Sequence, residues 1–182
     1  MEIRINDLFY IDFEASSLSR ESWPIEIGMA WIEGPGVQLW STLIRPDVSW
    51  DLDDWSLRSA EVHNIPYDEL MAAPRAADVA REVRTRLLGK TPVSDNTEFE
   101  QRWMNKLLGL VDTPSPEFLD YDLIAHSACH GFPEALDRVY ERLERTKTPH
   151  RAGKDAERLA NGILRGLQVK REAQTLGVSG PA

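Results

Sequence analysis

The sequence has almost no cysteine and no long apolar run. Cys129 is the only cysteine among 182 residues, which excludes an intramolecular disulfide and suits a reducing compartment. No uninterrupted apolar stretch approaches the roughly 18 residues needed to cross a bilayer, and the N-terminal residues lack the basic and then apolar layout of a signal peptide. Internal repeats and low-complexity segments are missing as well. We therefore expect a soluble, cytoplasmic protein.

Length and composition suit one domain. Hydrophobic residues make up 42% of the chain and charged residues 28%, which is enough for a sizeable core at this length. We place the single domain at residues 1–170. Residues 171–182 are polar and contain Gly and Pro, so we interpret them as a flexible C-terminal tail.

Charge is distributed unevenly along the chain. The formal net charge of -9 argues at first against a polyanionic partner. Residues 138–171 nevertheless hold ten Lys and Arg against four Asp and Glu, whereas residues 46–70 hold seven acidic residues against Arg58 alone. Charge runs are usually solvated faces. The asymmetry also permits an anionic ligand to be guided to one side of the protein.

Apolar periodicity and turn signals predict an α/β domain. The Gly34-Pro35-Gly36 turn joins two expected strands, and the strands as a set are expected at residues 8–14, 25–32, 37–44, 91–94 and 121–125. Helices are expected at residues 57–62, 76–89, 99–108, 133–145 and 155–167. Apart from its short helix, the segment 46–74 is expected to be irregular. This order predicts a mixed sheet with helices on its faces.

Two carboxylates interrupt the first apolar strand. Side chains two positions apart share one face of a strand, so Asp12 and Glu14 point into the same small volume. Two unpaired anions outside water would be very costly there. A divalent cation removes that cost, and hard oxygen ligands select Mg²⁺ or Mn²⁺. An edge strand, with both carboxylates solvated or paired with arginines, is the alternative for this triplet taken alone.

Two later segments carry further polar residues of interest. Asp95 follows a predicted strand and precedes a helix that contains Phe99 and Trp103. Taken alone, it also fits a helix cap or an Asx turn. His150 stands five residues before Asp155, at the start of the last helix. A lone histidine in such a basic loop also fits a solvated or helix-capping side chain.

In this order and at these separations, the three segments resemble the DnaQ-like family of 3′ to 5′ exonucleases. The likeness is to the subgroup named for four acidic residues and a histidine (DEDDh). The first family motif is similar to Asp12-Phe13-Glu14, the second to Asp95 with the helix behind it, and the third, His-x-x-x-x-Asp, to His150 and Asp155. Residues 44–46 and 61–65 resemble two connecting segments of the family. The resemblance spans residues 8–165 and implies an RNase H-like α/β fold, a mixed central sheet with an antiparallel first three strands.

The resemblance also implies a site for two Mg²⁺ or Mn²⁺ ions. Phosphodiester hydrolysis needs an attacking hydroxide, stabilised phosphate oxygens and a stabilised leaving oxygen, and two ions about 4 Å apart serve all three. By resemblance, Asp12 bridges both ions, and Glu14 and Asp155 complete the site of the ion that carries the attacking water. Asp95 is expected to act mainly through metal-bound water. His150 is expected to be the general base.

The loop after the first strand departs from the family pattern. Many members have Thr-Thr-Gly where this chain has Ala15, Ser16, Ser17 and Leu18. We expect backbone amides of residues 15–17 to contact the terminal nucleotide, with Leu18 beside its base. His63 is counted among these substrate-contact residues, and we interpret it as a packing or loop-ordering residue and not as a catalyst.

These observations predict a metal-dependent exonuclease that releases nucleoside 5′-monophosphates from the 3′ end of DNA or RNA. A single-stranded 3′ end is the expected partner, and the resemblance leaves a homodimer or a larger complex open. One alternative is a non-catalytic domain of the same fold that binds nucleic acid or protein. Another is a hydrolase of short oligonucleotides, because the acidic segment 46–70 would repel a long phosphate backbone.

Overall fold

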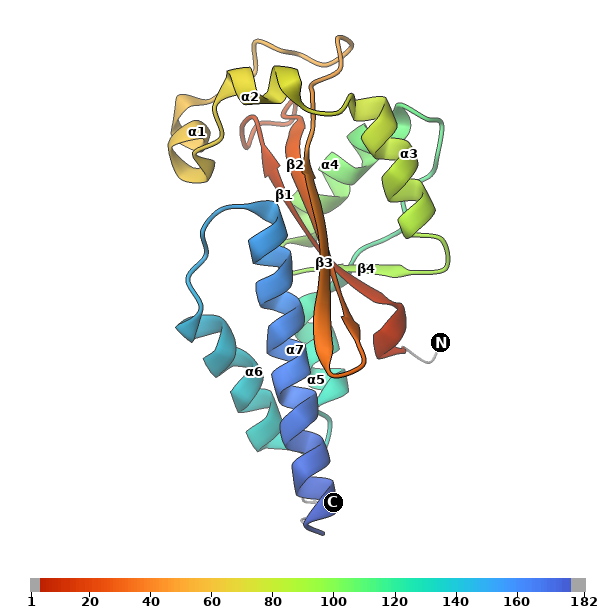
Figure 1. Cartoon of the computed structure of the whole chain (residues 1–182), viewed down its shortest axis with the longest axis vertical. Coiled ribbons are helices and arrows are strands. Elements are labelled where there is room, and N and C mark those ends of the chain that lie inside the picture. The colour runs from red at the N-terminus through yellow and green to blue at the C-terminus, as the bar shows by residue number, and fades with distance from the viewer. Residues whose placement is uncertain (1–3, 178–182) are drawn as a thin grey trace.

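A five-stranded mixed sheet lies at the centre of the protein, whose computed structural model describes residues 4–177 (Figure 1). The strand order is β3-β2-β1-β4-β5. β1 (Leu8–Ala15) pairs antiparallel with β2 (Pro24–Glu33), which pairs antiparallel with β3 (Gly36–Leu43). β4 (Thr91–Ser94) runs parallel to β1, and β5 (Leu119–Asp120) runs parallel to β4. The predicted mixed sheet with an antiparallel first unit is confirmed.

Helices cover both faces of this sheet and extend beyond its edge (Figure 1). A short 3₁₀ helix, η1 (Ile5–Asp7), precedes β1. The α-helices in chain order are α1 (Leu57–His63), α2 (Tyr67–Ala72), α3 (Ala76–Arg86), α4 (Thr97–Gly109), α5 (Tyr121–Ala128), α6 (Pro133–Arg145) and α7 (Ala152–Thr175). None of the helices in residues 4–177 is long and apolar enough to cross a membrane.

Side chains of β1 alternate between two hydrophobic cores. Phe9, Ile11 and Phe13 join the core that includes residues of α3 and α4. Leu8 and Tyr10 join the core that includes residues of α5, α6 and α7. Because strand residues alternate between the two faces, Asp12 and Glu14 continue the row of Leu8 and Tyr10. Both carboxylates therefore lie on the face that α7 covers.

One predicted strand is wrong. Residues 121–125 belong to helix α5, and the strand before them, β5, has only two residues. The Asp120 side chain caps the helix, since its Oδ1 accepts a hydrogen bond from the backbone N–H of Leu123 at 3.1 Å. Tyr121, Ile124 and Ala125 are buried at helical spacing. In a run this short, the apolar pattern alone does not separate a strand from a helix.

Two helical segments differ from expectation. α2 lies inside the segment expected to be irregular, and Leu70 is its only buried residue, so it has little apolar periodicity to reveal it. α7 begins at Ala152 and continues to Thr175. Residues 171–175, which we assigned to the tail, are therefore helical, and residues 178–182 lie outside the described residues.

The first turn of α7 approaches the sheet so closely that only glycine fits at the contact. A Cβ atom on Gly28 of β2 would lie 2.1 Å from the carbonyl oxygen of Ala152. A Cβ atom on Gly153 would lie 2.7 Å from Oγ of Ser41 in β3. Gly28 pairs with Asp12 of β1 in the sheet. Because neither glycine has a Cβ atom, the start of α7 can lie against the strand pair that carries Asp12.

Gly28→Ala should destabilise the protein by about 3 kcal/mol, because the new methyl group meets backbone that has to move. Urea denaturation followed by circular dichroism measures this loss. Gly109→Ala is the matched control: its Cβ atom meets nothing within 4 Å, so no destabilisation is expected. Equal midpoints for the two variants would contradict the role assigned to the contact.

Candidate active site

A cleft of about 680 Å³ opens at the carboxyl ends of β1 and β4. All five residues that the sequence indicated line it, namely Asp12, Glu14, Asp95, His150 and Asp155. β1 supplies the first two and the turn after β4 supplies Asp95. The loop before α7 and the first turn of that helix supply the last two. Parallel strands end at the same sheet edge, which is why residues far apart in sequence meet here.

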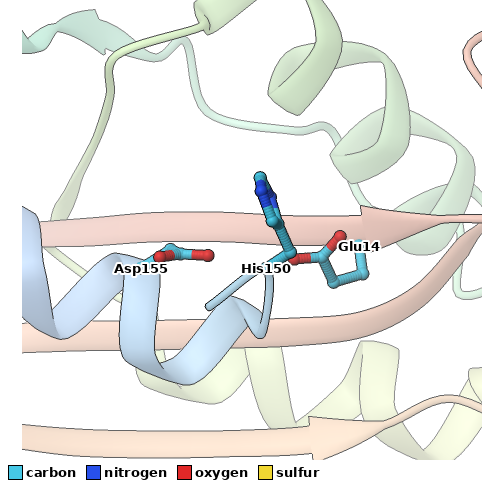
Figure 2. Close-up of side chains that lie close together, drawn as sticks. All are labelled: Glu14, His150 and Asp155. Atoms are coloured by element: carbon cyan, nitrogen blue, oxygen red, sulfur yellow. The ribbon is translucent and has the colours of Figure 1, made fainter. Parts of the chain in front are cut away.

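Glu14, His150 and Asp155 lie close enough to share one ligand. One ligand atom from each of the three side chains lies within 4.8 Å of the other two. Figure 2 shows that they come from three separate elements: β1, the loop before α7, and α7 itself. Asp155 is buried, whereas His150 is exposed. The cluster therefore has a fixed carboxylate side and an accessible imidazole side.

Burial and mutual repulsion raise the pKa values of the site carboxyls. Burial is the largest cause of the raised pKa of Asp12, followed by the charges of Glu14 and Asp155. Burial and the charge of Asp155 raise the pKa of Glu14 to about 8. Burial also raises the pKa of Asp155. At neutral pH, ionisation of all these carboxyls together costs free energy unless a cation binds between them.

Glu100 is a sixth site residue that the sequence reasoning missed. It lies on α4, is only 4% exposed, and lines the same cleft. Burial, followed by the charge of Asp12, raises its pKa well above the usual range. The signal was present in the sequence: Glu100 stands at helical spacing with the buried Trp103, Met104 and Leu107. A carboxylate on an apolar helix face indicates a functional role as strongly as one in an apolar strand does.

The loop that carries His150 is held by an ion pair between a buried glutamate and a half-exposed arginine. Nε and Nη2 of Arg151 donate to the two carboxylate oxygens of Glu26 on β2 at 3.0 and 2.9 Å. The backbone N–H of Ala152 also donates to Glu26, at 3.0 Å. His150 itself has φ 52°, in the left-handed region that non-glycine residues seldom adopt. The anchored residues after it hold this conformation in place.

The loop after β1 divides its residues between cleft and interior. Ala15 and Leu18 line the cleft, and the Leu18 side chain is 69% exposed at its rim. Ser16 and Ser17 are buried, and their hydroxyls are occupied within the protein. Oγ of Ser16 accepts from the Trp23 N–H, while Oγ of Ser17 donates to Asp54, each at 3.0 Å. Their side chains therefore shape the loop.

His63 orders a second wall of the cleft. Its Nδ1 accepts a hydrogen bond from the N–H of Ile65 at 3.0 Å, which agrees with a loop-ordering role. Burial lowers the pKa of His63, so the ring is neutral and Nε2 carries the proton. Nε2 has no hydrogen-bond partner in the described part of the chain. Asn64, directly after it, has φ 53°, the conformation for which asparagine is the best non-glycine residue.

The donor set fits hard divalent cations. Two buried oxygens, Oε2 of Glu100 and Oδ1 of Asp155, have no hydrogen-bond partner among residues 4–177. Unsatisfied carboxylate oxygens inside a protein are costly. Oxygen ligands from several carboxylates, with one imidazole at the edge, suit Mg²⁺ or Mn²⁺ better than softer metals. The residues present are therefore suited to hold such ions.

The chain belongs to the exonuclease family. The family model described as "Exonuclease" (RNase_T) matches residues 9–162, which include every site residue named above. The predicted membership of the DnaQ-like exonucleases is confirmed, and with it the prediction of a nuclease. None of the curated protein sequences compared with the chain matches it.

Solved structures share the fold at low sequence identity. A 3′-exonuclease from a structure of 3′-end specific recognition of a histone mRNA stem-loop matches with a TM-score of 0.66 and 16% identity, over 92% of this chain and 84% of that one. Exonuclease I of E. coli, in complex with a dA16 oligonucleotide, matches with a TM-score of 0.63 and 12% identity, over 89% of this chain and 42% of that one. The predicted RNase H-like fold class is confirmed.

Without metal ions, the protein should lose stability as the pH rises. The folded-state pKa of Glu14 is about 8, above its ordinary value of 4.5. The stability that its protonated form contributes is complete below about pH 4.5 and is lost as the pH rises through 8. We expect a lower melting temperature at pH 8.5 than at pH 6 in EDTA, measured by differential scanning calorimetry.

Added Mn²⁺ should reverse this trend, because a bound cation favours the ionised carboxyls. The double variant Asp12→Asn/Glu14→Gln serves as the control, since it removes two of the titrating groups. Its melting temperature in EDTA should change less between pH 6 and pH 8.5. A wild-type protein that gains stability with pH in EDTA would contradict the raised pKa values.

Proposed function

We propose that this protein is a metal-dependent 3′ to 5′ exonuclease that releases nucleoside 5′-monophosphates. One observation carries the proposal: Asp12, Glu14, Glu100 and Asp155 converge with His150 in a single cleft. A domain that only binds nucleic acid has no use for several carboxylates that repel one another. Phosphodiester hydrolysis assisted by two cations requires such a group of carboxylates to hold the cations.

The carboxylates have distinct places around the ions they would hold. Asp12 is our candidate for the residue shared by both ions, because the nearby charges of Glu14, Asp155 and Asp95 all contribute to its raised pKa and it lines the same cleft. Glu14 and Asp155 would hold one ion together, and the buried Glu100 would add a further oxygen. Asp95 is exposed at the rim and would contribute through water. Bound Mg²⁺ or Mn²⁺ would supply an activated water and neutralise charge on the phosphate.

His150 is our candidate for the general base that accepts the proton of the attacking water. Its imidazole lies on the accessible side of the cluster, within 4.8 Å of ligand oxygens of Glu14 and Asp155. Imidazole exchanges protons near neutral pH, which suits a general base. The pair of Glu26 and Arg151 fixes the backbone directly after His150 and so helps to position the ring.

The cleft has an apolar wall suited to a nucleobase and a polar wall suited to a phosphate. Leu18 and Phe99 line one part of it, where a terminal base would pack. His63 lines another part of the cleft, and its buried Nε2–H has no hydrogen-bond partner among residues 4–177, so a small shift of the ring would let it donate to a phosphate. A volume of about 680 Å³ admits a small number of nucleotides. These features support a single-stranded 3′ end as the substrate.

Asp12→Asn should lower kcat at least about 10³-fold, because it removes the charge shared by both ions and loses roughly 4 kcal/mol of transition-state stabilisation. Release of 5′-monophosphates from a labelled single strand in Mn²⁺ measures the effect. Asp53→Asn removes an exposed carboxylate outside the cleft and should leave kcat unchanged. Activity of Asp12→Asn close to that of the wild type would overturn the mechanism.

Glu100→Gln should have opposite effects on activity and stability. The variant removes an ion ligand, so the Mn²⁺ concentration needed for half-maximal activity should rise about 10- to 100-fold. It also removes a buried ionisable group, which costs free energy at pH 8 whether it is ionised or has taken up a proton, so the free energy of unfolding in EDTA at pH 8 should rise by about 1 kcal/mol. An unchanged Mn²⁺ requirement would show that Glu100 has no part in metal binding.

A further inference from the structure

A second hollow lies outside the active cleft, between α6 and α7. One part, of about 360 Å³, is lined by eight residues of the two helices, and four of these are arginines. An adjoining part, of about 250 Å³, is lined by the end of α6, the following loop and the start of α7. The two parts share Arg142 and Asn161, so they form one continuous surface. We call this surface the basic face; its cationic residues are Arg138, Arg142, Arg145, Lys147, Lys154, Arg158 and Arg165.

Several cationic side chains of the basic face have no carboxylate partner among the described residues. Its two carboxylates, Glu141 and Glu157, are already paired, the first with Arg138 and Arg145 and the second with Lys154. By contrast, no carboxylate in the described residues lies within 4.0 Å of the charged groups of Arg142, Lys147 or Arg165. All three are exposed. Their charges are free to act on a ligand.

One arginine of this face has a structural role instead. The guanidinium of Arg158 donates to the backbone oxygens of Leu143 and Thr146, at 3.1 to 3.2 Å. These bonds fasten the end of α6 to α7, and Figure 1 shows the two helices side by side. The exposed cations are therefore presented on a rigid pair of helices.

The basic face begins at the loop that carries His150. Thr146, Lys147 and Pro149 line the hollow, whereas Thr148 and His150 line the active cleft. A nucleic acid strand that leaves the cleft across this loop would therefore lie directly against the basic face. The protein as a whole carries a net charge of -9, so a polyanion is repelled on average and attracted here.

We propose that the basic face binds the phosphate backbone of the nucleic acid strand whose 3′ end occupies the cleft. The proposal rests on the exonuclease function proposed above and adds that long strands are the preferred substrates. Lys154 and Arg165 are eleven residues apart on α7, which corresponds to about 16 Å along the helix. One strand of a duplex places a phosphate every 3.4 Å along its axis, so the face spans at most about five phosphates and fewer of a more extended single strand. The planar guanidinium group of arginine can donate two parallel hydrogen bonds to the oxygens of one phosphate group.

The test compares a long and a short substrate. Arg142→Gln/Arg165→Gln should lower kcat/KM on a single-stranded 20-mer at least about tenfold at 50 mM salt, and leave kcat/KM on a trinucleotide unchanged. The slope of log(kcat/KM) against log[salt] for the 20-mer should become shallower by about 1.4, the value for two lost phosphate contacts on a single strand. Arg81→Gln/Arg84→Gln, which removes two exposed arginines of α3, is the matched control and should change neither substrate.

The remaining outcomes of this comparison also test the proposal. Equal losses on both substrates, or no loss on either, would overturn the proposal; in the second case an acidic protein becomes the better occupant. If the wild type hydrolyses neither substrate, the exonuclease function fails first, and fluorescence anisotropy with a labelled 20-mer in EDTA still tests the face. Weaker binding by the double variant than by the α3 control then supports the proposal, and equal binding overturns it.

Discussion

Repulsion between carboxylates in a partly buried cleft is the constraint to which the rest of this structure responds. Glu14 lies opposite Glu26 in the β1–β2 pair, yet only Glu26 has a cationic partner among the described residues. Arg151 neutralises Glu26 through a two-pronged ion pair. Among the described residues, Asp12, Glu14, Glu100 and Asp155 have no such cation within salt-bridge distance. The protein thus neutralises the carboxylate that anchors α7 to the sheet and leaves the others without a cation of its own, as the proposed metal site requires.

Holding those charges together requires close and rigid packing at the start of α7. Gly28 lets the backbone of Ala152 touch β2, and this contact seats Asp155 over the strand that carries Asp12. The Glu26 carboxylate then ties down the N–H of Ala152 and the side chain of Arg151. His150, directly before them, is held in a conformation that costs energy in a free chain. Precision at the site is therefore a product of the helix-to-sheet contact, which tolerates no side chain at one position.

Much of this could be predicted from the sequence, and the failures have physical causes. Two carboxylates in an apolar strand are conspicuous, so Asp12 and Glu14 were identified from local pattern. Glu100 was not predicted, because the apolar periodicity that predicts α4 comes from its aromatic and aliphatic residues, and a carboxylate on the same face adds nothing to that pattern. Residues 121–125 were expected to be a strand because five apolar-rich residues satisfy either period; the capping bond from Asp120 decides for the helix.

The sequence by itself determined the elements that have clear periodicity, the chemical type of the site and the unequal distribution of charge. These are local properties, written in the spacing and type of neighbouring side chains. Only the tertiary structure decided which carboxylates have a cationic partner within the protein and which have none. Glu26 and Arg151 are 125 positions apart and neutralise each other only after β2 and α7 pack, while the same packing buries Asp155 beside Glu14 and raises both pKa values. Burial and long-range pairing set the energy of a charge, and neither can be read from the chain before it folds.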